Sequence, residues 1–254
     1  MYTDEQLDQL EQEQHTITEE AIILMLFALS SLQGDLKKEL TDFYRKYGKD
    51  GVVTYKEARK WVSEENHTRR LTTLMLLFHN KFAETYVDEL EPEFRSFLTE
   101  VIWKESDFFG VDLDADDLLK QTWGVDDATW LTRLEDDVAL WDRYIFNDIK
   151  QSLLRQDNID QVLKQLDKRF MTIENVIRNL GLTESTAYGS IARKQVLKEL
   201  GITKYRFYTR ADERTCEVCG SMHGLIFPIS SYEIGVTASP LHPRCRCWEV
   251  PIRE

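Results

Sequence analysis

Four cysteines and one histidine near the end of the chain have the types and spacing of metal ligands. The cysteines are Cys216, Cys219, Cys245 and Cys247, and the 254-residue chain has no others. Two cysteines separated by two residues can bind one ion, because the turn between them points both sulfurs in the same direction. A second close pair completes a tetrahedron of soft ligands, which zinc favours. His242 is a substitute ligand for Cys245 or Cys247, and we predict a structural zinc site.

Two other interpretations of these cysteines stay open. They are free thiols or disulfides if the chain reaches an oxidising compartment, or they hold a catalytic zinc. A catalytic zinc needs an open coordination position and a nearby general base, whereas four thiolates would close the site. His223 and Glu213 lie close in sequence and could serve such an ion. For Asp212 and Arg214 we expect a structural role, orienting the first turn of this segment.

An acidic stretch resembles the start of a calcium-binding loop but lacks two required residues. Asp112, Asp114, Asp116 and Asp117 have the ligand spacing, yet Asp117 stands where the turn glycine is needed. Trp123 stands where the bidentate glutamate belongs. We therefore expect an acidic loop leading into a helix. The sequence has no phosphate-cradling glycine loop, no HExxH pair and no nucleophile elbow, so we predict no catalytic residues and no enzyme.

The composition favours a folded, acidic protein. Hydrophobic residues make up 42% and aromatic residues 11%, enough to bury a core, while the formal charge is -13. That charge argues against a general nucleic-acid binder, because phosphate contacts need clustered Lys and Arg. The N-terminus lacks the basic start and apolar stretch of a signal peptide. The apolar run 21–29 is shorter than the roughly 20 residues that cross a bilayer, so we expect a buried helix in a protein made in the cytoplasm.

Residues 1 to about 200 have the periodicity of helices. Apolar residues recur three and four positions apart, as in Leu36, Leu40, Phe43, Tyr44 and Tyr47, then Leu131, Leu134, Val138, Trp141, Ile145 and Ile149, then Val162, Leu163, Leu166 and Phe170. The segments 16–19 and 54–57 have capping-box spacing and predict two helix starts. Gly181 and Gly201 are predicted helix stops, because glycine tolerates the left-handed conformation there.

Beyond Gly201 the pattern changes to short strands. Alternating aromatics at 205–208, an apolar run at 224–228 and another at 248–250 predict three strands. The predicted fold is therefore mainly α: a helical N-terminal body, residues 1–180, and a small zinc-braced α+β module, residues 181–254. A module of three short strands buries little apolar surface, so a metal can supply the missing stability.

The helical body also carries candidate partner-binding residues. These are the aromatic stripe Phe43, Tyr44 and Tyr47, and Arg59 and Trp61 in a basic stretch running from Lys56 to Arg70. Aromatic and Arg residues are enriched as interface anchors. The alternative is that the stripe is internal and the basic stretch is an ordinary charged helix face.

The C-terminal segment resembles a known family. Residues 212–219, 224–227 and 240–247 look like the Mu F-like domain, the C-terminal domain of minor head (head morphogenesis) proteins of tailed bacteriophages. Glu184, in Thr183-Glu184, is similar to the residue that precedes the domain's first helix in that family. Residues 43–51, followed by Tyr55, Glu57 and Ala58, resemble the family's N-terminal helical region.

The resemblance implies a virion component in the head interior or at the portal vertex. It would associate with the portal protein and aid procapsid assembly or DNA delivery, and contacts with the major capsid or scaffolding protein stay open. No membrane association is expected. Two alternatives remain at this point. One is a zinc-dependent hydrolase or effector enzyme carried by a phage, and the other is a DNA-binding protein that aids packaging or protects ejected DNA.

Overall fold

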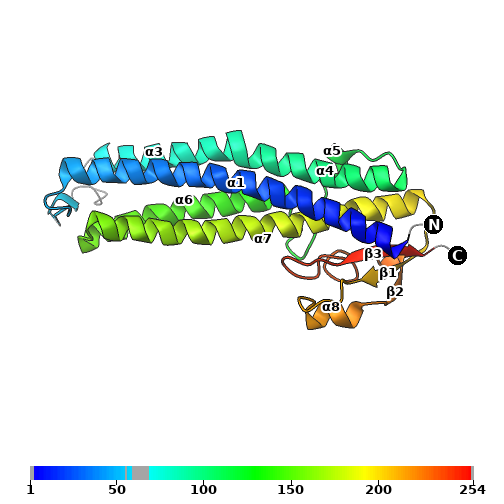
Figure 1. Ribbon diagram of the computed structural model, residues 1–254. Coiled ribbons are helices and arrows are strands. Elements are labelled where there is room, and N and C mark those ends of the chain that lie inside the picture. The colour runs from blue at the N-terminus through cyan, green and yellow to red at the C-terminus, as the bar shows by residue number, and fades with distance from the viewer. Residues whose placement is uncertain (1–2, 55, 59–68, 253–254) are drawn as a thin grey trace. The chain divides into compact units, whose positions relative to one another are not determined.

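The computed structural model describes residues 3–54, 56–58 and 69–252 (Figure 1). Its helices are α1 (Asp4–Tyr47), α3 (Arg69–Thr85), the π-helix η1 (Tyr86–Leu90), α4 (Glu91–Phe109), α5 (Ala115–Leu118), α6 (Trp130–Arg155), α7 (Ile159–Glu199), α8 (Glu217–Met222) and the 3₁₀-helix η2 (Ile229–Ser231). The strands are β1 (Lys204–Tyr208), β2 (Ile226–Pro228) and β3 (Trp248–Ile252). The protein is mainly helical with a small C-terminal sheet, as predicted.

The chain forms two compact units, each built from separated segments. Unit 1 contains residues 1–23, 93–133 and 178–254, and unit 2 contains residues 24–92 and 134–177. The predicted division at 180/181 therefore falls inside α7, which runs without a break through that position. The C-terminal strands of unit 1 also have partners in its N-terminal segment, since Arg206 on β1 pairs with Asp4 at 3.0 Å.

Helix α1 begins earlier than the sequence predicts. Thr3 and Gln6 form the capping pair: the Gln6 N–H donates to Thr3 Oγ1 at 3.1 Å, and the Thr3 N–H donates to Gln6 Oε1 at 3.0 Å. The predicted start at 16–19 is wrong, because Thr16 lies inside α1 and its hydroxyl donates to the carbonyl of Gln12 four residues back. The second predicted cap is confirmed, since Thr54 Oγ1 accepts from the Glu57 N–H at 3.4 Å.

The described residues of unit 2 form a helix bundle built mainly from α3 and from parts of α1, α6 and α7 (Figure 1). The predicted apolar stripes form its core, and Leu36, Leu40, Trp141 and Ile145 are at most 3% exposed. Cross-helix polar contacts surround that core: Lys81 on α3 pairs with Asp35 on α1 at 2.7 Å, His79 on α3 contacts Asp142 on α6, and Arg169 on α7 pairs with Asp148 on α6. Helical periodicity alone thus located the buried face of each helix.

Gly181 is not a helix stop but a point of close approach. A Cβ at this position would lie 3.0 Å from Ile22 Cγ1 and 3.1 Å from its Cδ1, and Ile22 is fully buried. Glycine is therefore needed here for the contact between α7 and α1 within unit 1. The second predicted stop, Gly201, is confirmed, because it follows the end of α7 with φ +65°.

The sheet has the strand order β2-β1-β3, and both pairs are antiparallel. Pro251 lies inside β3, opposite Tyr205, so the strand runs past the predicted range 248–250. A proline is tolerated there because β3 is an edge strand, which can leave one N–H position unpaired.

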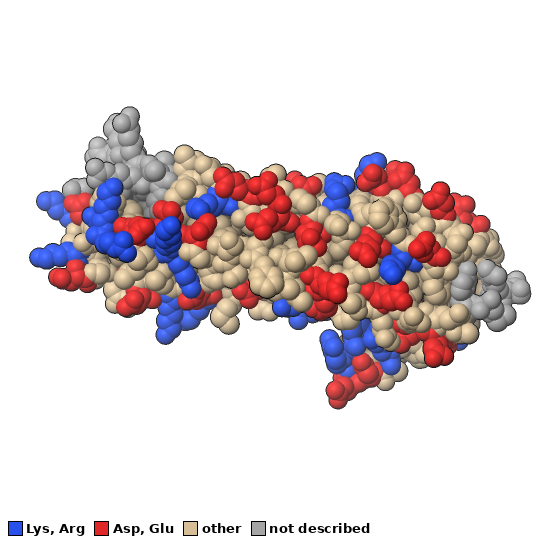
Figure 2. All heavy atoms as spheres, turned by 45° about the horizontal axis from the view of Figure 1, so that its top comes forward, with Lys and Arg blue, Asp and Glu red and all other residues tan. Residues whose placement is uncertain are grey.

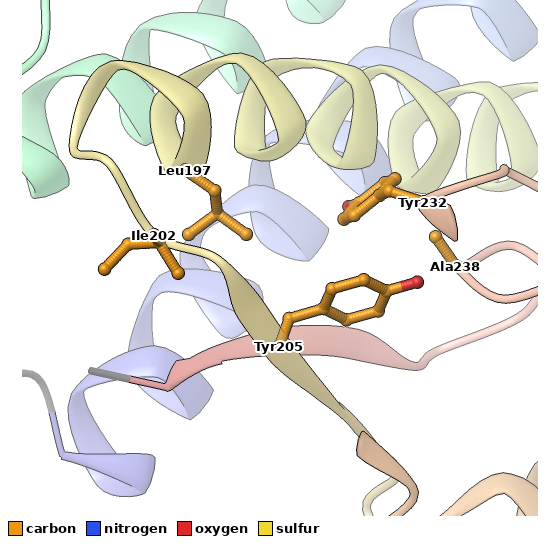
Figure 3. Packing of buried hydrophobic residues seen from close by; sticks show 5 residues of the cluster. All are labelled: Leu197, Ile202, Tyr205, Tyr232 and Ala238. Carbon is orange, nitrogen blue, oxygen red and sulfur yellow. The ribbon is translucent and has the colours of Figure 1, made fainter. Parts of the chain in front are cut away.

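One face of the sheet packs on α7 of unit 1 through a small apolar core (Figure 3). Leu197 points from α7 toward Ile202 and Tyr205, and Tyr232 and Ala238 close the far side of this cluster. The rings of Tyr205 and Tyr232 lie 4.7 Å apart in a tilted arrangement. This packing fixes β1 against α7.

Within the described residues, α1 is the one helix long and apolar enough to span a membrane, judged by length and composition alone. An 18-residue window of α1 has a mean hydropathy of 1.3. The apolar stretch is therefore longer than the run 21–29 considered from the sequence alone. Core helices of soluble proteins pass the same test, and 39% of the window is buried. Ile22, Met25 and Leu29 are at most 1% exposed, so this stretch supplies core residues.

Candidate metal centre

The first cysteine pair is presented by the short helix α8. Cys216 is its N-cap residue, and its Sγ accepts a hydrogen bond from the backbone N–H of Cys219 at 3.4 Å. The turn that precedes α8 is held by Asp212, whose Oδ1 accepts from the Arg214 N–H at 3.0 Å. The two thiols therefore lie on the same side of the turn, as their spacing predicts.

The second set of ligand atoms comes from the loop that leads into β3. His242 Nε2 lies 3.2 Å from the Sγ atoms of both Cys216 and Cys219, and Cys245 Sγ lies 3.7 Å from Cys219 Sγ. In a tetrahedral zinc site with Zn–S near 2.3 Å, two sulfurs are about 3.8 Å apart. Two triads share Cys219: one with Cys216 and His242, the other with Cys245 and Cys247.

The cluster is closed in by apolar side chains. Cys219, Cys245 and Cys247 are at most 5% exposed and pack with Phe207 of β1. The cavity at the cluster has a volume of about 30 Å³, and all four cysteines are free thiols. A set of soft ligands around so small a space fits an ion that holds the fold together, and the disulfide alternative does not match this arrangement.

The protonation of the thiols alternates around the cluster. The Cys219 N–H lowers the pKa of Cys216, and a hydrogen bond from the Cys247 thiol lowers the pKa of Cys245 to about 5. Burial raises the pKa of Cys219 to about 12, and the same Cys245–Cys247 hydrogen bond raises the pKa of Cys247. Since metals bind thiolates, loading the site with zinc must release protons from the remaining thiols.

The residues considered for an enzyme have other contacts. His223 Nδ1 accepts from the Thr209 N–H at 3.1 Å, and its ring lies 4.9 Å from that of Tyr208. Glu213 is exposed in the turn before α8. Neither belongs to the two ligand triads found among the described residues.

Asp212 holds the turn before α8, and its carboxylate also binds an arginine outside that turn. Its carboxylate binds Arg246 at 2.7 and 2.9 Å, not the side chain of Arg214. The Arg246 hydrogen bonds hold the pKa of Asp212 at about 2. This pair ties the turn before α8 to the loop that carries Cys245 and Cys247.

Glu184 lies within α7 and is 1% exposed. It accepts from Trp123 Nε1 at 2.9 Å and from Arg133 Nη1 at 3.1 Å. Burial outweighs these contacts and raises the pKa of the carboxyl to about 7. Glu184 thus joins three segments of unit 1, but it lies inside α7 and does not precede a helix as the resemblance had implied.

The remaining sequence predictions concern residues away from the cysteines. Asp114 caps α5 by accepting from the Asp117 N–H at 3.1 Å, so the acidic stretch is a loop leading into a helix, as expected. Phe43 is 7% and Tyr44 3% exposed, which places both rings in the core of unit 2 and not on a partner surface. Tyr47 is half-buried, and Arg59 and Trp61 lie outside the described residues.

The cysteine-bearing segment also matches a family of known proteins. Residues 143–250 fit the family model described as Phage Mu protein F like protein. Residues 143–250 are therefore similar to the Mu F-like domain. The match starts in α6, well before residue 181, and it includes α7 together with every cysteine and His242. Searches of curated proteins and of solved structures return no match. The family suggests a phage head morphogenesis protein and a place in the virion.

His242 is the ligand candidate whose position the sequence understates. It was predicted as a substitute, yet its Nε2 approaches two cysteine sulfurs directly. The available signal was its spacing, three residues before Cys245. A His three residues from a cysteine can reach the same ion when the intervening backbone turns, and here the Cys245 N–H donates to the His242 carbonyl at 3.2 Å.

Proposed function

We propose that this protein is a minor head protein of a tailed phage that associates with the portal and aids procapsid assembly or DNA delivery. The family match over 143–250 carries the proposal. The domain's cysteine cluster supports a bracing role, because it joins α8 to the loop before β3. Protein–protein contact, not catalysis, is the proposed mode of action.

In this proposal the cysteine cluster holds one structural zinc ion. Cys216, Cys219 and Cys245 supply three ligands and His242 the fourth, with Cys247 as the alternative fourth ligand. The set fits zinc because soft thiolates and an imidazole are its preferred ligands. When bound, the ion cross-links two segments separated by more than twenty residues, which stabilises a module with only three short strands.

The partner surface is proposed to lie on the helices and not on the predicted aromatic stripe. Leu24 and Phe27 on α1 are 55% and 69% exposed within unit 2. Exposed apolar side chains of this size are the usual anchors of protein interfaces. The strands and α8, in contrast, spend most of their apolar residues on their own core.

Co-expression with the portal protein tests the function. Tagged full-length chain should capture the portal of the same phage from cells that make both, and the major capsid protein expressed alone serves as the comparison. A Phe27→Glu variant should reduce portal capture several-fold with its zinc content unchanged. If the wild-type chain captures no portal, or if it turns over peptide, ester or phosphodiester substrates and loses that activity with Glu213→Gln, the proposal fails.

A further inference from the structure

A second cavity of about 140 Å³ lies beside the cysteine cluster in unit 1. Besides the buried Arg193, four arginines line it: Arg210, Arg214, Arg244 and Arg246. The same four arginines line the small cavity at the cysteines, so the two spaces share a wall. Figure 2 shows Lys and Arg side chains on the C-terminal module, as well as on the helices, with acidic side chains among them. A concentration of positive charge is unusual in a chain of net charge -13.

Two buried hydrogen-bond donors, on residues that line this cavity, have no acceptor in the protein. Arg210 Nε and Trp248 Nε1 are buried without a hydrogen-bond partner, and both residues line the cavity. The Arg210 guanidinium lies 5.9 Å from the centre of the Trp248 ring. Leaving a buried donor unpaired costs roughly 1–3 kcal/mol. The donors on the wall therefore lack acceptors, and a ligand with several oxygen atoms would supply them.

The guanidinium groups of two further arginines are not paired with a carboxylate. Within the described residues, the side chains of Arg214 and Arg244 form no ion pair and no hydrogen bond, and both residues are exposed, which places them at the open side of the cavity. Arg246 is the exception, since Asp212 binds it. Arg210 has only a long contact, 3.7 Å from Asp8.

The carboxylates that line the cavity are already engaged. Glu249 accepts from the Ser239 N–H at 2.7 Å and from the Tyr232 hydroxyl at 2.8 Å. Glu11 pairs with the buried Arg193 at 2.8 Å, and Glu19 lies 3.6 Å from Arg178. They therefore do not neutralise Arg214 and Arg244, and an excess of positive charge faces the cavity.

The arginine loops are fixed in place before any ligand binds. Arg244 and Ala211 both have positive φ, 58° and 50°, which non-glycine residues adopt only when their surroundings enforce it. The Arg244 N–H donates to Thr183 Oγ1 at 3.1 Å, and the Thr186 hydroxyl donates to the Cys245 carbonyl at 3.0 Å. Both threonines lie on α7, so the long helix holds the loop in register.

From these contacts we propose that the cavity binds a phosphate group of a small molecule, either inorganic phosphate or the phosphate of a mononucleotide. Guanidinium groups match the oxygens of a phosphate in charge and geometry and bind it bidentately. A water needs roughly 10–15 Å³ of such volume, so the cavity has room for a phosphate and several waters. Arg214 and Arg244 close over the anion, and Arg210 and Trp248 donate from the wall.

Calorimetric titration of the full-length, zinc-loaded protein with inorganic phosphate and with AMP tests the proposal. Arg214→Gln and Arg244→Gln should each weaken phosphate binding at least tenfold. Arg143→Gln is the matched control, because Arg143 is exposed on α6 in unit 2 and the charge change is the same. Tighter binding of AMP than of phosphate would support the proposal and assign the phosphate to a nucleotide.

Metal content and thermal unfolding of each variant separate ligand binding from structure. The proposal expects unchanged zinc content and an unchanged unfolding temperature without phosphate. If Arg214→Gln and Arg244→Gln lose zinc instead, the arginines serve only to balance the charge of the thiolates, and the proposal is overturned. It is also overturned if millimolar phosphate gives no heat, if Arg143→Gln weakens binding equally, or if duplex DNA binds while phosphate and AMP do not.

Discussion

At the scale of single residues, Glu184 makes the stability of unit 1 depend on pH. Burial raises the pKa of its carboxyl to about 7, above the value near 4.5 that it has when exposed. The folded state therefore holds this proton more tightly than the unfolded state does. The stability gained is fully present below pH 4.5 and is lost as the pH rises through 7.

A Glu184→Gln variant should remove that dependence. Between pH 5 and pH 8, the free energy of unfolding of the wild type should fall more than that of the variant, by up to about 3 kcal/mol. Urea unfolding at each pH measures the difference. Glu100→Gln is the control, because Glu100 is exposed on α4 and belongs to the same unit. Parallel pH profiles for wild type and Glu184→Gln would show that burial does not set the protonation of this carboxyl.

His242 and Cys247 compete for the fourth position at the metal centre, and the distances favour the histidine. His242→Ala should lower the zinc content of the purified protein well below one ion per chain, whereas Cys247→Ser should retain most of it. The reason is that His242 Nε2 lies 3.2 Å from both Cys216 and Cys219. Elemental analysis after dialysis gives the stoichiometry, and the reverse ranking of the two variants would identify a four-thiolate site.

At the scale of elements, alanine substitutions of two glycines on α7 separate the effect of close packing on stability from that of helix propensity. Gly181→Ala should destabilise the protein by about 1 kcal/mol, because the new methyl overpacks against Ile22 and this outweighs the gain in propensity. Gly189→Ala should be neutral or stabilising, since its nearest neighbours lie 3.6 Å away. Chemical denaturation of both variants measures the contrast. Adding Ile22→Val to Gly181→Ala should recover stability, and failure to do so would rule out the contact with Ile22.

The same glycine shows what a sequence can and cannot predict. Local spacing was sufficient for the cysteines, for the three strands and for the buried stripe of each helix, because those features depend on neighbours in sequence. Gly181 resembles a helix stop, but its role depends on Ile22, far away in the chain. The start of α1 was misplaced for a local reason, because Thr3 and Gln6 cap the helix earlier than Thr16 would. The inward position of Phe43 and Tyr44 likewise required the three-dimensional structure.

At the scale of the whole molecule, unit 1 depends on residues from both ends of the chain. Arg193 on α7 is 1% exposed and binds Glu105 on α4 through two hydrogen bonds, and it also pairs with Glu11 on α1. Removing one partner of a buried ion pair costs roughly 3–5 kcal/mol, since the remaining charge is left in the core. This cluster could not be predicted from local spacing, because its members are separated by more than eighty residues.

A fragment limited to residues 143–254 should therefore lack fixed tertiary structure, even with zinc. It contains the family-matched segment and all the metal ligands, but it leaves Arg193 without Glu11 and Glu105. Near-ultraviolet circular dichroism and dispersion of amide resonances should report a loosely packed state. Mixing with residues 1–142 should restore the native signals, and a well-dispersed spectrum of the fragment alone would contradict the prediction.

The pairing of distant segments in unit 1 also sets an order of events during synthesis. Asp4, Asp8 and Glu11 leave the ribosome long before their partners Arg206, Arg210 and Arg193 are made. Unit 2 uses only residues 24–92 and 134–177, so all of its parts emerge earlier. A nascent chain can complete the bundle and still carry an unpaired acidic start, and a truncated translation product never completes unit 1. Unit 1 is thus finished only by ribosomes that have translated the segment 178–254.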